Sequence, residues 1–137
     1  MQVGYIDSSV LLRLLLKEPG KMLALDGFER LISSELLRVE CLRVLYRYRL
    51  TGQFSDDRLA EHITLFHQLL DEISIIPLSP LVIQRACLPS PTVLGTLDAI
   101  HFVTAQLWQE NQNQGLVLLT HDVQLQTAGR SVGMKIG

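Results

Sequence analysis

The stretch MQVGYIDSSVLL (1–12) decides the fold class, because an apolar strand pattern passes through one acidic residue into a helix pattern. QVGYI (2–6) is an apolar run typical of a buried strand. Ser8 or Ser9 is a suitable N-cap for a helix that continues to about Leu16. Asp7 stands at the junction. A strand that leads directly into a helix is the repeating unit of a parallel α/β sheet.

The same alternation of strand and helix continues to the end of the chain. Pro19-Gly20 ends the first helix and Thr51-Gly52 ends the long one, while a loop rich in proline occupies 88–96. We expect one domain over 1–137, an α/β three-layer fold in which helices cover both faces of a central parallel sheet of four to five strands. The further strands are predicted at 31–33, 73–78 and 115–120, and the further helices at 21–29, 34–50, from 55, from 79, around 98 and after 122.

Composition restricts the class of protein and its partners. Of 137 residues, 47% are hydrophobic, and the formal net charge is −2, so the chain lacks the basic excess of many nucleic-acid-binding domains. Any contact with nucleic acid therefore needs a local basic patch, although a solvated helix face is the alternative for these residues. The candidates are Arg13, Lys17, Arg38, Arg43, Arg47 and Arg49.

The location of the protein is also constrained by the sequence. No apolar stretch approaches the ~20 residues of a membrane span, and the N-terminus has no signal-peptide pattern. Cys41 and Cys87 form no metal-binding spacing, and we expect both to be buried and reduced. These features favour a cytoplasmic protein. The surplus of leucine fits either a leucine-rich core or a dimer interface on the helices before residue 73.

Four carboxylates stand where a parallel sheet would bring them together. Asp7 and Asp122 follow predicted strands, Asp98 opens an apolar helix in TLDAIHFVTA (96–105), and Glu40 lies on the long helix. In open α/β sheets, ligands bind beyond the carboxyl ends of the strands. Carboxylate oxygens are the ligands that Mg²⁺ prefers, and a carboxylate-bound cation can activate water for phosphodiester hydrolysis.

Each acid also has an ordinary structural interpretation. Asp7 and Asp122 could cap a helix or form a turn, and Asp98 could stabilise the N-terminus of its own helix. Glu40 could form an i,i+3 pair with Arg43. No one of these residues indicates a metal site alone. Their positions on the predicted sheet make the set a candidate metal centre.

Four motifs resemble those of the PIN domain family, and within it the VapC-type toxins of bacterial toxin–antitoxin pairs. YIDSS (5–9) resembles the first strand of the family with its first acid, and SSELLRVE (33–40) resembles the second motif, which ends in the second acid. TLDAIHFVTA closely matches the third motif, and LLTHDVQL (118–125) resembles the fourth. The motifs occur in the family's order across residues 3–136.

This resemblance implies a PIN-like fold and a metal-dependent endoribonuclease. It implies that Asp7, Glu40, Asp98 and Asp122 bind Mg²⁺ or Mn²⁺, with Asp122 acting directly or through water. Ser9 and Thr120 carry over as hydroxyls that hold the acids in place. The resemblance further implies an RNA substrate, a homodimer and an inhibitory antitoxin protein. Gly95 departs from the family, because related toxins often carry arginine there.

The remaining acid and histidines leave alternatives open. Glu35 is interpreted as an acid at a helix N-terminus rather than a metal ligand. His101 shares a helical face with Asp98, so it could contact phosphate, transfer a proton or bind metal, or it could be a buried supporting histidine. His62 and His67 have the spacing of surface residues rather than of a helical zinc site.

Other functions fit the sequence less well than a ribonuclease. A phosphoaspartyl phosphatase would need an acid at position 9, where Ser9 stands, and a receiver domain would need paired acids before Asp7. A dinucleotide-binding domain would need a glycine-rich turn after the first strand. A catalytically silent binding module with the same fold is the remaining alternative.

Overall fold

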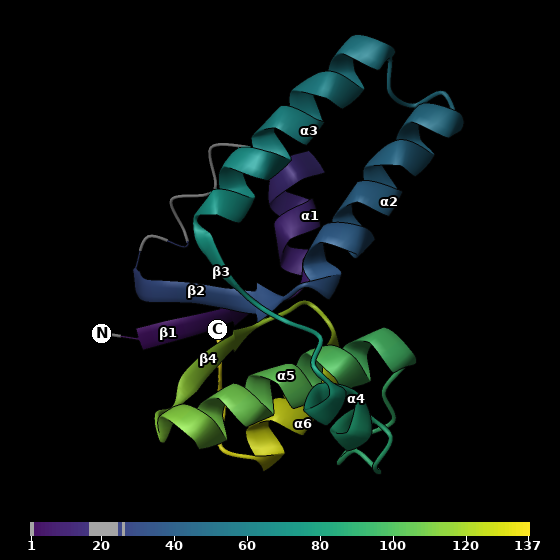
Figure 1. The fold of residues 1–137 in the computed structure, drawn as a ribbon. Coiled ribbons are helices and arrows are strands. Elements are labelled where there is room, and N and C mark those ends of the chain that lie inside the picture. Colours follow the sequence, from purple (N-terminus) through teal and green to yellow (C-terminus); the bar gives the residue numbers. More distant parts are fainter. Residues whose placement is uncertain (1, 17–24, 26) are drawn as a thin grey trace.

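The computed structural model describes residues 2–16, 25 and 27–137. Within those residues, a five-stranded parallel sheet lies between two groups of three helices (Figure 1). The strands are β1 (Gln2–Ile6), β2 (Phe28–Ser34), β3 (Ile73–Ile76), β4 (Leu116–Leu119) and β5 (Lys135–Ile136). The helices are α1 (Ser8–Leu16), α2 (Leu36–Leu50), α3 (Asp56–Asp71), α4 (Pro80–Ala86), α5 (Thr96–Gln112) and α6 (Val123–Ser131).

The order of the strands places β1 at the centre of the sheet. The order is β3-β2-β1-β4-β5, and every pairing is parallel. The chain first builds outward from β1 through β2 to β3, and later continues on the other side of β1 with β4. The direction of building therefore reverses between β1 and β4. In open α/β sheets such a reversal opens a crevice at the carboxyl ends of the two strands.

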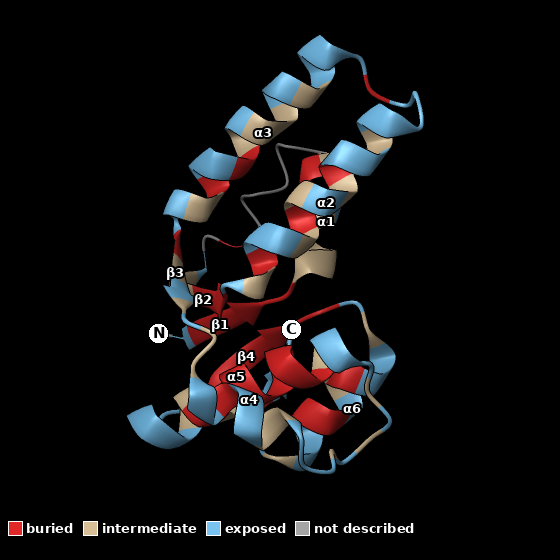
Figure 2. Ribbon diagram, turned by 45° about the vertical axis from the view of Figure 1, so that its right-hand side comes forward, coloured by how far each residue is buried: buried red, intermediate tan, exposed pale blue. Residues whose placement is uncertain are grey.

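Alternating side chains of the strands pack into two separate cores. Tyr5 of β1 and Leu118 of β4 are fully buried on the face that α4, α5 and α6 cover. Ile6 and Leu119 point to the opposite face, where they pack with α1, α2 and α3. Figure 2 shows this layering as buried strands between helices whose outer faces are exposed. The alternation follows from the two-residue period of a strand.

The predicted fold class is confirmed, with differences at particular elements. The sheet begins its second strand at Phe28, so the end of the helix predicted over 21–29 is wrong, and its residues 21–24 and 26 lie outside the described residues together with Pro19-Gly20. Ser34 belongs to β2 rather than to the following helix. The first helix is capped by Asp7 instead of Ser8 or Ser9, because the Asp7 Oδ1 atom accepts the Val10 N–H at 3.2 Å.

The cysteines differ from each other in exposure. Cys41 is fully buried in α2, where burial raises the pKa of its thiol. Cys87 is exposed at the end of α4, so the prediction that it is buried is wrong. Both are free thiols. The short helix α4 ends at this residue and leaves it at the start of a loop.

The leucine-rich helices keep most of their leucines inside. Large exposed apolar side chains are more frequent after residue 73, where most of them lie on α4, the loop before α5 and the start of α5. Among the described residues, these are Ile75, Leu81, Ile83, Leu88, Val93, Leu97 and Val123, against Val39, Tyr46 and Leu50 before residue 73.

In the described ranges, none of the helices combines the length and apolar character needed to cross a membrane.

Candidate active site at the carboxyl edge of the sheet

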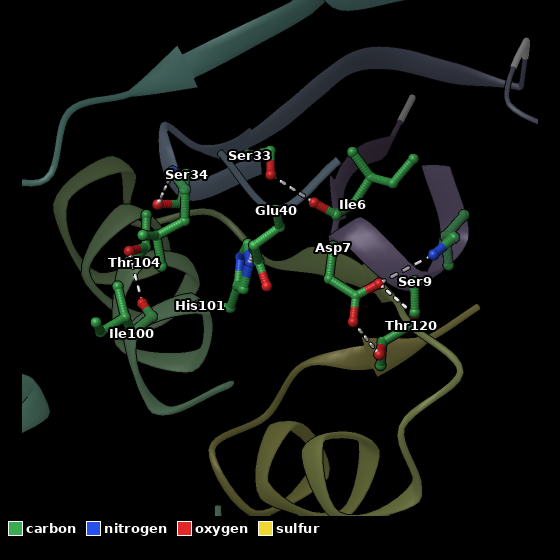
Figure 3. Close-up of polar contacts among 12 residues, drawn as sticks. Ile6, Asp7, Ser9, Ser33, Ser34, Glu40, Ile100, His101, Thr104 and Thr120 are labelled. Carbon is green, nitrogen blue, oxygen red and sulfur yellow. Dashed lines mark hydrogen bonds and ion pairs between the residues drawn. The ribbon is translucent and has the colours of Figure 1, made fainter. Parts of the chain in front are cut away.

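Asp7 is the buried centre of the candidate site. It follows β1 directly, its backbone N–H donates to the Leu119 carbonyl of β4, and only 3% of the residue is exposed. The Ser9 hydroxyl donates to Asp7 Oδ1 at 2.6 Å, and the Thr120 hydroxyl donates to Asp7 Oδ2 (Figure 3). Hydrogen bonds to both oxygens fix the orientation of the carboxylate.

Thr120 connects Asp7 to the acid that follows β4. Its Oγ1 atom donates to Asp7 and accepts the Asp122 N–H at 3.1 Å. Asp122 also caps α6, because its Oδ1 accepts the Leu125 N–H at 2.8 Å. The capping interpretation of Asp122 is therefore confirmed. Its second carboxylate oxygen has no hydrogen-bond partner among the described residues.

Glu40 reaches the site from the opposite side, from the first half of α2. Its Oε1 atom lies 2.6 Å from His101 Nε2 on α5 (Figure 3). His101 is 1% exposed, and its Nδ1 atom lies 2.7 Å from the phenol oxygen of Tyr5 in β1. The Glu40 side chain remains 16% exposed. The i,i+3 pair of Glu40 with Arg43 is not formed, because Glu40 contacts His101 instead.

Asp98 lies in the first turn of α5 and interacts electrostatically with the other three acids. Burial raises the pKa of Asp98 above its usual value, and the negative charges of Asp122, Asp7 and Glu40 raise it further, whereas His101 lowers it. Asp98 therefore lies close enough to the other three predicted acids to feel their charges. Like charges in a partly desolvated site repel one another.

A hard divalent cation fits this site by charge and by donor type. Four carboxylates and two hydroxyls gather at one edge, and in the described ranges no lysine or arginine forms an ion pair with Asp7, Asp98 or Asp122. No three His, Cys, Asp or Glu side chains of the described residues lie close enough together to enclose a metal ion. This is not a closed protein cage. Mg²⁺ commonly binds through one or two carboxylates and keeps several waters.

The other acid and histidines considered from the sequence lie outside the site. Glu35 accepts the backbone N–H of Leu78 and has no side-chain capping bond. His62 stacks against Phe54 with ring centroids 4.6 Å apart, so it is partly buried. His67 is exposed on α3. The sequence interpretation that none of these residues belongs to the metal site agrees with their positions.

The arginine residues considered as a basic patch lie in different parts of the structure. Arg43 and Arg47 line a groove of about 270 Å³ on α2, together with Glu40 and Ser8. On the other side, Arg13 Nη1 lies 3.4 Å from His121 Nε2, and the His121 backbone N–H donates to the Ser9 hydroxyl.

The remaining basic candidates do not border the acids. Arg49 hydrogen-bonds to Asp56 at the far end of α2, and Arg38 lines a different groove with Glu35. Lys17 lies outside the described residues.

Tyr5 is the residue at this site that the sequence did not indicate. In QVGYI it occupies an alternating apolar position of a strand, where an aromatic side chain is expected in the core. The available signal is that a buried tyrosine usually finds a hydrogen-bond partner for its hydroxyl. Nothing in the sequence shows that this partner is His101.

Comparison with known proteins agrees with the predicted family and fold. The family model described as PIN domain matches residues 4–130. The chain belongs to the PIN domain family. The match leaves out residues 1–3 and 131–137.

Individual PIN relatives cover nearly the whole chain. Ribonuclease VapC47 of Mycobacterium tuberculosis (strain CDC 1551 / Oshkosh) is 34% identical over an alignment of 136 residues, and the match covers 94% of this chain and 91% of that protein. The crystal structure of PAE2754 from Pyrobaculum aerophilum has a TM-score of 0.65 at 20% identity and covers 98% of this chain and 83% of its own. A toxin–antitoxin complex from Klebsiella pneumoniae has a TM-score of 0.63 at 20% identity and covers 90% of this chain and 89% of its own.

Proposed function

We propose that this PIN domain is a metal-dependent endoribonuclease that acts as the toxin of a toxin–antitoxin pair. The observation that carries the proposal is the position of Asp7 and Asp122 at the reversal point between β1 and β4, together with the electrostatic interaction of Asp98 with Asp7, Glu40 and Asp122. The identity of 34% to a protein named Ribonuclease VapC47 supports RNA as the substrate. Residues 1–137 act as a single catalytic domain in this proposal.

The four acids together are proposed to hold Mg²⁺ or Mn²⁺. Asp7 is the fixed ligand, because Ser9 and Thr120 hold both of its oxygens. Asp122 contributes the oxygen that does not cap α6, directly or through water. When bound, the cation supplies positive charge that neutralises the scissile phosphate and makes an attacking water more acidic. Ser9 and Thr120 position Asp7.

RNA approaches the acids along two basic borders of the site. The groove with Arg43 and Arg47 opens beside Glu40, and Arg13 with His121 lies near Ser9. Guanidinium groups on both sides can bind phosphates that flank the scissile bond. This arrangement supplies local positive charge to a chain whose formal net charge is −2.

The proposed partner is an antitoxin protein that inhibits the enzyme. The likeness of the fold to a chain of the toxin–antitoxin complex from Klebsiella pneumoniae supports this part of the proposal. A homodimer and a cytoplasmic location remain predictions. For the dimer, the exposed apolar side chains of α4 and the start of α5 are better candidates than the helices before residue 73.

The proposal is tested by incubating the purified protein with total RNA in Mg²⁺, in Mn²⁺ and in excess EDTA. We expect cleavage in one or both metals and none in EDTA. Expression should arrest growth of a bacterial host, and co-expression of the adjacent reading frame should relieve the arrest if that frame encodes the antitoxin. Absence of cleavage in every condition, with binding of RNA retained, would favour a catalytically silent binding module.

A further inference from the structure

Three side chains from three elements form a continuous hydrogen-bonded chain that ends at Glu40. The phenol oxygen of Tyr5 on β1 lies 2.7 Å from Nδ1 of His101 on α5, and His101 Nε2 lies 2.6 Å from Oε1 of Glu40 on α2. The Tyr5 and His101 rings meet edge to face, with centroids 5.8 Å apart. The sheet and the helices on both of its faces are joined at this point.

The hydrogen bond between His101 and the carboxylate of Glu40 has one direction of donation. Burial raises the pKa of Tyr5 far above its usual range, so the phenol keeps its proton at neutral pH and can donate it. A carboxylate such as Glu40 can only accept. With a neutral imidazole, the arrangement that satisfies all three groups has Tyr5 donating to Nδ1, and Nε2–H donating to Oε1 of Glu40. A protonated imidazole also donates to Glu40 from Nε2–H.

Burial makes this arrangement rigid. Tyr5 is 0% exposed and His101 is 1% exposed, so neither ring has water as an alternative partner. Glu40 differs, because its side chain is 16% exposed and lines the groove that contains Arg43 and Arg47. The Oε1 atom of Glu40 is therefore held by His101, while Oε2 stays available for another ligand.

We propose that Tyr5 and His101 are positioning residues that hold Glu40 Oε1 and leave Oε2 to bind the divalent cation. The inference rests on the proposed metal-dependent function and adds a specific role for two residues that do not touch substrate. Hydrogen-bond partners that orient metal-binding side chains commonly change metal affinity by about 10- to 100-fold when removed.

Three substitutions separate positioning from packing. His101→Gln keeps an N–H donor close to the position of Nε2, whereas His101→Leu fills part of the space and removes the donor. Tyr5→Phe keeps the buried ring and removes only the hydroxyl that selects the tautomer. Glu61→Gln, in an exposed position of α3, is the matched control. Thermal unfolding of each variant identifies any loss caused by folding.

The first measurement needs no metal. Nitrogen-15 NMR of the histidine side chains in the metal-free protein distinguishes the two neutral tautomers. We expect His101 to carry its proton on Nε2 in the wild type, and to lose this single tautomer in Tyr5→Phe. A proton on Nδ1 alone in the wild type would overturn the proposal, because Nε2 could not then donate to Glu40.

The second measurement is Mn²⁺ affinity by calorimetry. We expect His101→Leu to bind about 10- to 100-fold more weakly than the wild type, and His101→Gln to stay within about threefold. Equal affinity in all variants, with wild-type RNA cleavage intact, would overturn the positioning role alone. A wild type that neither binds Mn²⁺ nor cleaves RNA would overturn the proposed function, and this inference with it.

Discussion

At the scale of single residues, the negative charges of the candidate site reduce the stability of the folded, metal-free protein. Asp98 sits near three other acids, and its pKa is raised first by burial and then by Asp122, Asp7 and Glu40. Groups placed for function commonly reduce the stability of the free protein. The metal-free protein should therefore be more stable when one of these charges is removed.

Asp98→Asn should raise the melting temperature in EDTA at neutral pH. The pKa of Asp98 is higher in the folded protein than its ordinary value of 3.8, so the folded state binds the proton more tightly than the unfolded state. The associated stability is present below pH 3.8 and is lost as pH rises through the folded pKa. We expect a rise of about 1–2 °C, small because water screens a partly exposed group.

Melting curves of the wild type and Asp98→Asn at several pH values test this expectation. The difference should be largest at neutral pH and should shrink as pH falls toward 3.8. Glu61→Gln is the control for loss of an exposed charge. A difference that grows at low pH would contradict the assignment of the raised pKa to Asp98.

At the scale of secondary-structure elements, one residue serves a helix and the candidate site together. Asp122 caps α6 through Oδ1, so a loss of activity in its variants has two possible causes. Asn is as good an N-cap as Asp, whereas Ala is not. The two substitutions separate the cap from the charge.

Asp122→Asn should retain stability, whereas Asp122→Ala should lose about 1 kcal/mol. Both should cleave RNA more slowly than the wild type, because both lack the carboxylate charge. Urea unfolding and cleavage rates measured side by side test the pair. If Asp122→Asn cleaved RNA at the wild-type rate, Asp122 would be a cap and no part of the metal site.

The α2 arginines give a second prediction at this scale. Arg43→Gln with Arg47→Gln should raise the KM for RNA by about tenfold and leave kcat nearly unchanged, because these groups lie beside the acids rather than among them. The salt dependence of RNA binding should weaken by up to about two phosphate contacts. Arg130→Gln on α6 is the control. An equal effect of Arg130→Gln would mean that net charge alone was responsible.

Elements with strong apolar runs were predictable, and those with weak runs were not. The runs at β1, β3 and β4 identified their strands. The bounds of β1 were predicted correctly, whereas β3 and β4 have ends that differ by one or two residues. The first residues of β2 were not predicted as strand. They are Phe28, Glu29 and Arg30, which are exposed or half-buried and form no apolar run. β5 has two residues, too few for a pattern.

At the scale of the whole molecule, strand order explains why residues distant in sequence meet. Asp7 and Thr120 are 113 residues apart, yet they touch because β1 and β4 are parallel neighbours. The parallel class followed from the alternation of strands and helices, and it predicted that Asp7 and Asp122 share an edge. The positions of Glu40 and Asp98 depend on how α2 and α5 pack, and only the resemblance to PIN domains supplied Glu40.

The contacts that Tyr5 and His101 make near the acids could not be predicted from the sequence. Tyr5 and His101 are 96 residues apart, and their contact depends on the face that each presents across the sheet. His101 could be placed near Asp98 by helical period, but the sequence left several roles open for it. In the structure His101 is buried and contacts Glu40, a position that agrees with the alternative of a supporting histidine.

The central claim is that four acids act together through a bound divalent cation to cleave RNA. The most direct measurement is the single-turnover cleavage rate of one RNA across Mn²⁺ concentrations for Asp7→Asn, Glu40→Gln, Asp98→Asn and Asp122→Asn. We expect each rate to fall by about 100-fold or more, which corresponds to a loss of several kcal/mol of stabilisation, while Glu35→Gln remains within about threefold of the wild type. Mn²⁺-dependent cleavage that survives both Asp7→Asn and Asp98→Asn would contradict the account.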